Sequence, residues 1–242
     1  MSTFVLVHGA WHEGSAWNEV IKQLEAKGHQ AFAPTIADHG KGVNKNVNHA
    51  QCTQSIVDYI VDKDLTDIIL LGHSFGGTII AKVAEAIPDR IRRLIFFDAF
   101  VLNDGESLRD NILPDSQALF DSQARESDDN TVMLPFDVWR EAFINDADIE
   151  LAQSSYGQLS PEPYQPFIDK LDLKQFYSLP IPKSYLYCTE DNVLPQGEQW
   201  GWHPRMSNRL GLFRLVQMPG SHEVMFSNPI GLAEKIIVAG RD

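Results

Sequence analysis

The chain of 242 residues is long enough for one large α/β domain, or for one domain with an insertion, and its 43% hydrophobic and 22% charged residues are ordinary for a globular protein. Its formal net charge of −13 argues against a nucleic-acid partner. No apolar run reaches the roughly 18 residues that a membrane-spanning helix needs, so no such helix is expected.

The beginning of the chain and its cysteines predict a cytoplasmic location. Residues 1–8 lack the basic region and the cleavage site of a signal peptide and are typical of a buried strand. Cys52 and Cys188 are far apart and fit no metal-ligand spacing. We interpret them as buried free thiols in a reducing compartment.

The first hundred residues alternate between strand and helix patterns. Strands are predicted at residues 4–8, 30–33, 67–71 and 91–98. Helices are predicted from residue 17 to a stop at Gly28, around residues 52–63, and over residues 75–86, with a loop rich in Gly and Asn at 38–48. This alternation predicts a mostly parallel sheet with helices on both faces.

The alternation stops at residues 99–180 and then resumes. Residues 101–180 hold sixteen acidic and five basic side chains, which we interpret mainly as a solvated surface. Trp139, Phe143 and Ile149 are expected to share a helix there. We predict a helical cap at 101–180, inserted into an α/β-hydrolase core made of residues 1–100 and 181–242. In the second part of the core we expect strands at 183–188 and 212–216, a helix after Pro195 that includes Trp200, and a C-terminal helix through Leu232 and Ile236.

The segment Gly72-His73-Ser74-Phe75-Gly76 has the pattern G-x-S-x-G and lies between a predicted strand and a predicted helix. In that context the pattern is typical of a nucleophile elbow, a strained turn that exposes the serine hydroxyl. The flanking glycines are expected because a Cβ there would collide with the neighbouring strand and helix. The alternative is an ordinary glycine-rich loop.

A serine hydroxyl needs a base, and the base needs an orienting carboxylate. Asp191 follows the strand predicted at 183–188, and His222 follows the last strand, which gives the chain order Ser, Asp, His. The carboxyl ends of parallel strands meet at one edge of a sheet, so Ser74, Asp191 and His222 can come together there. Alternatives remain open: Asp98 or Glu190 as the acid, and His203 as the base.

An acyl-transfer intermediate carries an oxyanion, which two backbone N–H groups must face. The residue after the nucleophile, Phe75, supplies one. The loop His8-Gly9-Ala10-Trp11 supplies the other, and Ala10 is the candidate. The alternative is that this loop only makes a tight turn.

Four segments resemble one branch of the α/β-hydrolases, namely residues 4–12, 72–77, 188–191 and 220–222. This is the branch of hydroxynitrile lyases and plant methylesterases, whose bacterial members include pyrethroid-hydrolase-like carboxylesterases. The resemblance covers the whole core and is thin in the cap, apart from Leu159-Ser-Pro-Glu-Pro163. It implies either ester hydrolysis or cyanohydrin cleavage.

Two positions favour the esterase. The plant lyases of the branch carry a threonine in the oxyanion loop and a lysine directly after the catalytic histidine, where this chain has Gly9 and Glu223. A lysine would stabilise departing cyanide, whereas a glutamate would repel it. Ser74 argues against the haloalkane dehalogenases and epoxide hydrolases of this fold, which use an aspartate nucleophile.

The sequence therefore predicts a carboxylesterase-type serine hydrolase that acts on small to medium neutral hydrophobic esters, without cofactor or metal. The alternatives are hydrolysis of a lactone, thioester or carbon–carbon bond, cyanohydrin cleavage, or a ligand receptor on a hydrolase scaffold. The oligomeric state stays open, with a homodimer as one option. Candidate pocket residues, each of which could instead be ordinary core, are Trp11, Phe100, Leu102, Trp139, Phe143 and Met225.

Overall fold

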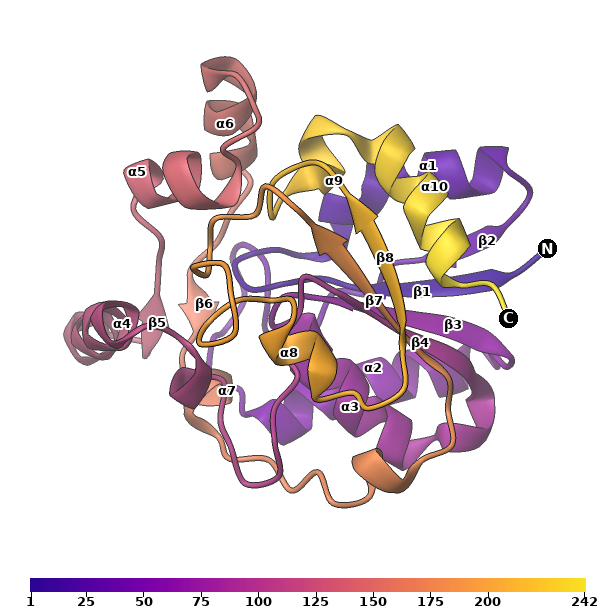
Figure 1. Ribbon diagram of the computed structural model, residues 1–242. Coiled ribbons are helices and arrows are strands. Elements are labelled where there is room, and N and C mark those ends of the chain that lie inside the picture. Colours follow the sequence, from indigo (N-terminus) through magenta and orange to yellow (C-terminus); the bar gives the residue numbers. More distant parts are fainter.

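A six-stranded, fully parallel sheet organises the computed structural model, which describes residues 1–242. The strands lie in the order β2-β1-β3-β4-β7-β8 (Figure 1). Their bounds are β1 Thr3–Val7, β2 Gln30–Phe32, β3 Ile68–His73, β4 Ile91–Phe97, β7 Lys183–Cys188 and β8 Arg214–Met218. Every residue of the central strand β3 is buried, because both faces of the sheet are covered.

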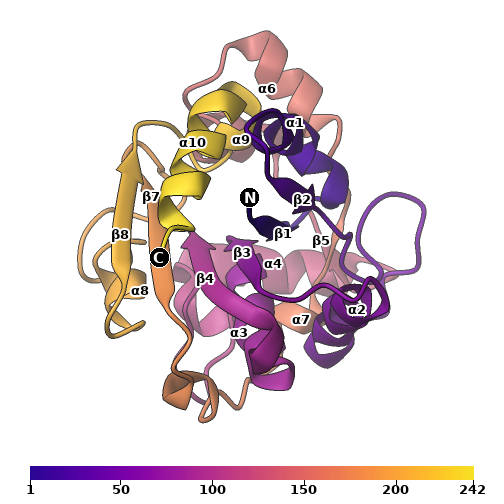
Figure 2. The same ribbon diagram turned by 90° about the vertical axis from the view of Figure 1, so that its right-hand side faces the viewer.

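Helices cover both faces, as the alternating pattern predicts (Figure 2). One face carries α1 (Asn18–Ala26), α9 (Val224–Ser227) and α10 (Pro229–Ala239). The other carries α2 (His49–Asp62) and α3 (Gly76–Ala86). Alternate side chains of each strand enter two separate apolar clusters, with Val5 and Leu70 in one and Phe4 and Ile69 in the other. The predicted α/β-hydrolase architecture is confirmed.

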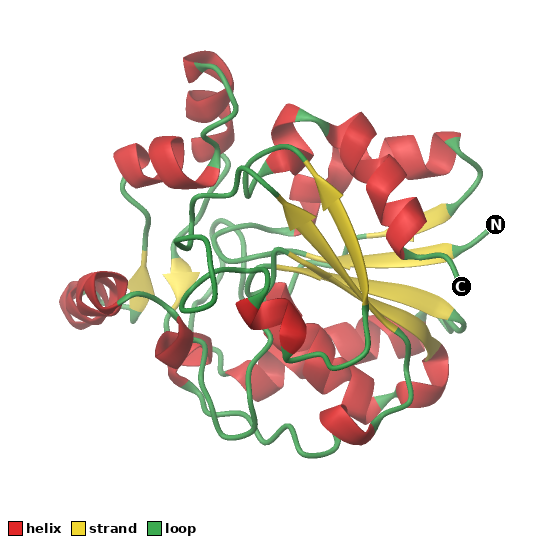
Figure 3. Ribbon diagram, viewed as in Figure 1, coloured by secondary structure: helices red, strands yellow, loops and turns green.

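The residues that follow β4 form the cap elements at the carboxyl edge of the sheet (Figure 3). They are α4 (Pro114–Glu126), β5 (Thr131–Val132), α5 (Phe136–Val138), a π-helical turn (Trp139–Phe143), α6 (Ile149–Tyr156), β6 (Glu162–Pro163) and α7 (Gln165–Ile168). The antiparallel pair β5–β6 was not expected in a helical cap. The boundaries at residues 100 and 180 stay a prediction.

Three predicted elements differ from the structure. Trp139 and Phe143 do not share a helix with Ile149, because the chain breaks at 144–148 and the Asp148 side chain caps a new helix. The helix after Pro195 is absent: residues 195–203 form turns, and only the short α8 (Arg205–Asn208) follows. Gly197 has φ +114°, which is incompatible with helix. β8 begins at Arg214, after Gly211 at φ +73° and a Leu212 that is 96% exposed.

Both cysteine side chains are buried as free thiols, and burial raises the pKa of each. The predicted burial of Cys52 and Cys188 is therefore confirmed. No helix of the structure is both long enough and apolar enough to cross a membrane.

Candidate active site

The elbow places Ser74 in a left-handed backbone conformation, with φ 53°. Such a conformation costs roughly 1–2 kcal/mol for a residue other than glycine. Hydrogen bonds on both sides hold it, because the Ser74 N–H donates to the Phe97 carbonyl at 3.2 Å and the Ser74 carbonyl accepts from Gly77 and Phe100, each at 3.1 Å. The local structure thus has the strain that the motif predicts.

The glycines of the elbow are required by close backbone contacts. A Cβ on Gly72 would lie 2.4 Å from the Gly76 carbonyl oxygen, at the start of α3. A Cβ on Gly76 would lie 2.7 Å and 2.8 Å from the carbonyl oxygens of His8 and Val7, at the end of β1. The neighbouring helix and strand therefore leave no room for a side chain at either position.

His222 and Asp191 form a buried pair in the loops after β8 and β7. The His222 Nδ1–H donates to Asp191 Oδ2 at 2.5 Å, and both side chains are no more than 1% exposed. The Val193 N–H donates to the other oxygen, Oδ1, at 2.9 Å. Burial lowers the pKa of His222, but the charge and the hydrogen bond of Asp191 offset this and leave the pKa raised. The imidazole is therefore oriented, and its basicity is increased.

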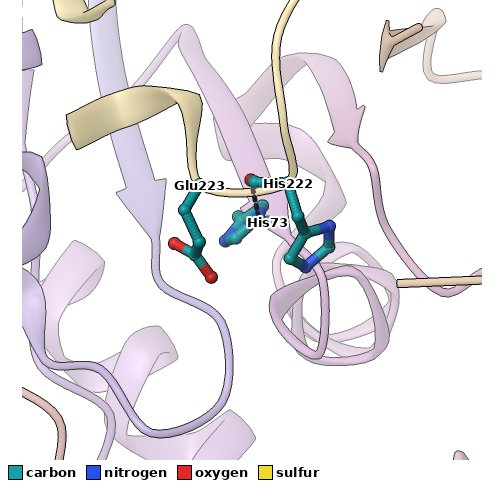
Figure 4. A group of neighbouring side chains, drawn as sticks. All are labelled: His73, His222 and Glu223. Carbon is teal, nitrogen blue, oxygen red and sulfur yellow. Dashed lines mark hydrogen bonds between the residues drawn. The ribbon is translucent and has the colours of Figure 1, made fainter. Parts of the chain in front are cut away.

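Aromatic rings fix the His222 ring from several sides. The Trp202 indole stacks on it at 5.3 Å between centroids, and Phe143 meets it edge-on at 5.4 Å. The His73 ring, in the elbow, is 4.5 Å away. The His73 Nε2–H donates to the backbone carbonyl of His222 at 3.1 Å, which ties the elbow to the histidine loop (Figure 4).

Ser74 itself makes no side-chain hydrogen bond with His222 in this structure. The His222 Nε2 atom is buried without a partner. The structure thus joins Asp191 to His222 directly and brings the elbow beside them through His73, while the contact between the Ser74 hydroxyl and Nε2 is not formed.

The alternatives for acid and base have other hydrogen-bond partners. Asp98 is fully buried close to the His222–Asp191 pair, and both its carboxylate oxygens accept from the Cys188 N–H at 3.1 Å. Burial, and next the charge of Asp191, raise the pKa of Asp98. Glu190 is exposed, and His203 Nδ1 bonds the Ser207 hydroxyl at 2.7 Å. Of the two candidate bases, only His222 has a carboxylate partner.

The backbone N–H groups of Ala10 and Phe75, the two oxyanion-hole candidates, make no hydrogen bond within the chain. Both residues line the same cavity as Ser74. In the loop after β1, the next N–H, that of Trp11, is already committed to the Glu162 carboxylate at 2.7 Å. Ala10 and Phe75 stay the candidates for an oxyanion hole.

The cavity at Ser74 has a volume of about 220 Å³ and lies between core and cap. Fifteen of its eighteen lining residues are hydrophobic, and the polar ones are Ser74, Asp115 and Ser116. Of the candidate pocket residues, Trp11, Phe100 and Phe143 line this cavity, and Leu102, Trp139 and Met225 do not.

The side chains of Leu102, Trp139 and Met225 are buried in the hydrophobic core. Trp139 is completely buried and donates its Nε1–H to the Ala152 carbonyl. Met225 packs in the cluster under α1 and α10, on the other face of the sheet. Leu102 is a buried core residue whose carbonyl accepts from the Tyr177 hydroxyl.

The two positions that separate this chain from the plant lyases are both enclosed. A Cβ on Gly9 would lie 2.9 Å from His73 Nδ1 and 3.1 Å from the Ser74 Cβ, so a threonine has no room without a shift of the elbow. Glu223 is 2% exposed, and its Oε2 is 3.0 Å from His12 Nε2. Neither position offers a cation to a leaving group.

The side chains His73, His222 and Glu223 lie close enough for a metal to bridge them (Figure 4). One atom of each side chain already has a partner, since His222 Nδ1 is bonded to Asp191, Glu223 Oε2 to His12 and His73 Nε2 to a backbone carbonyl, while His73 Nδ1 and His222 Nε2 have none. Asp98, Asp191 and His222 form a second such group, which the same His222–Asp191 bond occupies. Both groups contain His222, the base of the predicted triad, and the absence of a metal stays a prediction.

Sequence reasoning missed two buried residues beside the site, Glu162 in the cap and His39 in the loop after β2. Glu162 Oε1 is 2.9 Å from His39 Nε2. The available signal was Glu162 within Leu159-Ser-Pro-Glu-Pro163, the one cap segment that resembled the family.

The strained serine at a strand-to-helix turn, the buried histidine–carboxylate pair and the doubly wound sheet together define an enzyme of the hydrolase class. The chain belongs to the alpha/beta hydrolase family, which it matches over residues 4–235. This confirms the family that the motifs predict, and the relatives described next, which include named esterases, confirm the enzyme class, a carboxylesterase-type hydrolase.

Named relatives cover nearly the whole chain. An extracellular alpha/beta-hydrolase from a Paenibacillus species, described as sharing structural and functional homology with tobacco salicylic acid binding protein 2, is 47% identical, with a TM-score of 0.97 and full coverage of both chains. A carbendazim hydrolyzing esterase from Nocardioides is 27% identical over 99% of this chain and 100% of its own length. A pyrethroid hydrolase from Sphingobium wenxiniae is 26% identical over 98% of this chain and 86% of its own.

Proposed function

We propose that the chain is a serine-dependent carboxylic ester hydrolase that acts on small to medium neutral hydrophobic esters through an acyl-enzyme. The observation that carries this proposal is the His222–Asp191 pair beside a serine held at positive φ in the elbow. The names of the relatives, which include several esterases, support the ester bond as the target.

In the proposed mechanism, the Ser74 hydroxyl attacks the ester carbonyl while His222 Nε2 takes its proton. Asp191 keeps the proton on Nδ1 and stabilises the imidazolium that forms. The Ala10 and Phe75 N–H groups bind the oxyanion. His222 then returns the proton to the departing alcohol, and a water molecule, activated by the same histidine, releases the acid. The Ser74–His222 hydrogen bond has to form when substrate binds, as is common for catalytic contacts.

The cavity supports the proposed substrate class. Its lining is almost entirely apolar, so an ester with hydrophobic acyl and alcohol groups gains from burial there. A substrate carboxylate would be desolvated near Ser74 without a permanent cationic partner, since no lysine or arginine lines the cavity. The chemistry requires no cofactor and no macromolecular partner. The cytoplasmic location stays a prediction, and the Paenibacillus relative is described as extracellular.

The test is a series of nitrophenyl esters of increasing acyl length, measured with the natural chain and with Ser74→Ala, together with labelling by a fluorophosphonate. We expect hydrolysis with a burst of nitrophenol, and covalent labelling that Ser74→Ala abolishes. Binding of esters without turnover or labelling would instead identify a receptor. Efficient release of cyanide from mandelonitrile, at a rate comparable to ester hydrolysis, would favour the lyase.

A further inference from the structure

A buried ion pair joins the cap to the loop that carries Ala10. Glu162, in β6, is 1% exposed, and its two oxygens bond different parts of the core. Oε2 accepts from the Trp11 N–H at 2.7 Å, and Oε1 is 2.9 Å from His39 Nε2. The other ring nitrogen of His39 donates to the Ala37 carbonyl at 2.8 Å. Both ring nitrogens of His39 therefore face acceptors, which is the arrangement of a charged imidazolium.

The pKa of His39 agrees with this arrangement. Burial lowers it, while the charge and hydrogen bond of Glu162 raise it, and the net direction is upward. The pair is almost completely removed from water, so both charges depend on their partners.

Trp11 is strained, and the cap holds it by three contacts. Its φ is +64°, a conformation that a bulky residue rarely adopts. Besides the bond from its N–H to Glu162, its carbonyl accepts from the Ser160 N–H at 3.0 Å. Its indole Nε1–H donates to the Val132 carbonyl at 3.1 Å. All three partners belong to the cap, two of them to the strands β5 and β6.

The same pair contacts the other half of the predicted oxyanion hole. The His39 ring stacks on the ring of Phe75 at 5.9 Å between centroids, with 13° between the planes. His39 and Glu162 thus contact the residue after Ala10 on one side and Phe75 on the other. Hydrogen-bond donors stabilise a transition state best when their directions are fixed before the reaction.

We propose that Glu162 is a positioning residue for the oxyanion hole. Its carboxylate, oriented by His39, binds the Trp11 N–H and holds the strained loop so that the Ala10 N–H points into the cavity. The inference rests on the proposed ester hydrolysis at Ser74. The cap then has a role in the chemical step, besides forming the walls of the cavity.

Three substitutions separate geometry from charge. Glu162→Gln keeps an acceptor for the Trp11 N–H, and its amide can donate to a neutral His39. Glu162→Asp keeps the charge but withdraws the carboxylate by one methylene from Trp11. Glu162→Leu removes the acceptor. We expect kcat close to that of the natural chain for Gln, about tenfold lower for Asp and about 10²-fold lower for Leu, with little change in KM, because a misplaced group costs about that much.

A transition-state analogue gives the decisive readout. We expect a trifluoromethyl ketone analogue of the best ester to bind Glu162→Leu more weakly by the factor lost in kcat, while the alcohol product, which carries no oxyanion, binds unchanged. Asp121→Asn is the matched control, because Asp121 is a cap carboxylate bonded to Arg109 and Tyr164 and has no contact with the oxyanion loop. It should leave kcat unchanged.

Several results would overturn the proposal. One is a rise in KM with unchanged kcat for Glu162→Leu, which would limit Glu162 to shaping the cavity. Another is a Glu162→Asp variant as active as the natural chain together with a Glu162→Gln variant of low kcat, which would show that the charge at this position matters and its exact placement does not. If Glu162→Leu does not fold, the ranking of kcat between Glu162→Gln and Glu162→Asp tests the proposal. Retention of full activity by Ser74→Ala would reject the proposed function itself, whatever the Glu162 variants do.

Discussion

The loops at the carboxyl edge of the sheet and the cap each contribute a buried carboxylate that pairs with an imidazole. Asp191 and His222 follow the adjacent strands β7 and β8, so the parallel sheet alone brings them together. Glu162 and His39 belong to the cap and to the loop after β2, and no strand pairing connects them. The sheet places groups through backbone topology, whereas the cap acts through side-chain contacts. Changes at the sheet edge should therefore affect the chemistry most, and changes in the cap should modulate it.

The largest effect is expected at the elbow. Ser74→Ala should lower kcat by on the order of 10⁴ or more, because no other nucleophile lines the cavity in that position. Ser116→Ala, which changes the other serine of the cavity, should retain near-normal kcat. The measurement is turnover of a nitrophenyl ester, with circular dichroism to confirm folding. More than a tenth of normal turnover in Ser74→Ala would reject the assignment.

Asp191→Asn should come next, with a loss of about 10⁴ in kcat, because an amide favours the wrong imidazole tautomer. Asp98→Asn should lose much less, since Asp98 accepts from the Cys188 N–H and makes no hydrogen bond with the imidazole ring. Comparing the two variants tests whether the position at the end of β7 or that at the end of β4 supplies the acid. The reverse ranking would transfer the role to Asp98.

The pH dependence should show the raised pKa of His222. Asp191 and Glu223 raise this pKa against the effect of burial, so protonation of Nε2 begins above the usual pKa of histidine, about 6.5. An imidazolium cannot accept the Ser74 proton, so kcat/KM should fall as the pH decreases through the raised pKa of His222. We expect the midpoint of the acid limb above 6.5. A constant rate down to pH 4 would exclude a histidine base.

The smallest effect is expected at the mouth of the cavity, where charge from the cap meets the substrate. Asp115 is the one charged residue of the lining and is exposed. Asp115→Asn should raise kcat/KM for a carboxylate-bearing ester a few-fold at low salt, leave a neutral ester unchanged, and lose this advantage as salt screens the charge. Glu150→Gln, an exposed change on α6, is the control. Equal and salt-independent values for both esters would show that the acidity of the cap is only a solvated surface.

The core was predictable because its signals are local. Local sequence determines the strand before Gly72, the helix after Ser74 and the strand before Asp191. Parallel pairing of the strands then brings their carboxyl ends to one edge of the sheet. The position of Asp191 after the penultimate strand favoured it as the acid, but Asp98 stayed an alternative, since both follow buried strands. Only the packing of their side chains shows which carboxylate reaches the histidine.

The cap was less predictable because its contacts are distant in sequence. Each strand of the β5–β6 pair has two residues, too few for a periodic pattern. The bond from Trp11 to Glu162 joins positions 151 residues apart. Trp200 looked like part of a helix from its neighbours alone, but Gly197 and the close approach of Gly201 to it impose turns. Trp139 was an aromatic candidate for the pocket, but its side chain is buried inside the cap, where its Nε1–H donates to the Ala152 carbonyl.

The burial of Cys52 and Cys188 makes the natural chain a ready background for site-specific labelling. Both thiols are inaccessible and have raised pKa values, so a maleimide should leave them unmodified in the folded protein. A single cysteine introduced at the exposed Ala118 on α4 would then be the only reactive thiol. A fluorophore there, with no prior removal of native cysteines, would report in real time on whether the α4 wall of the cavity moves during turnover.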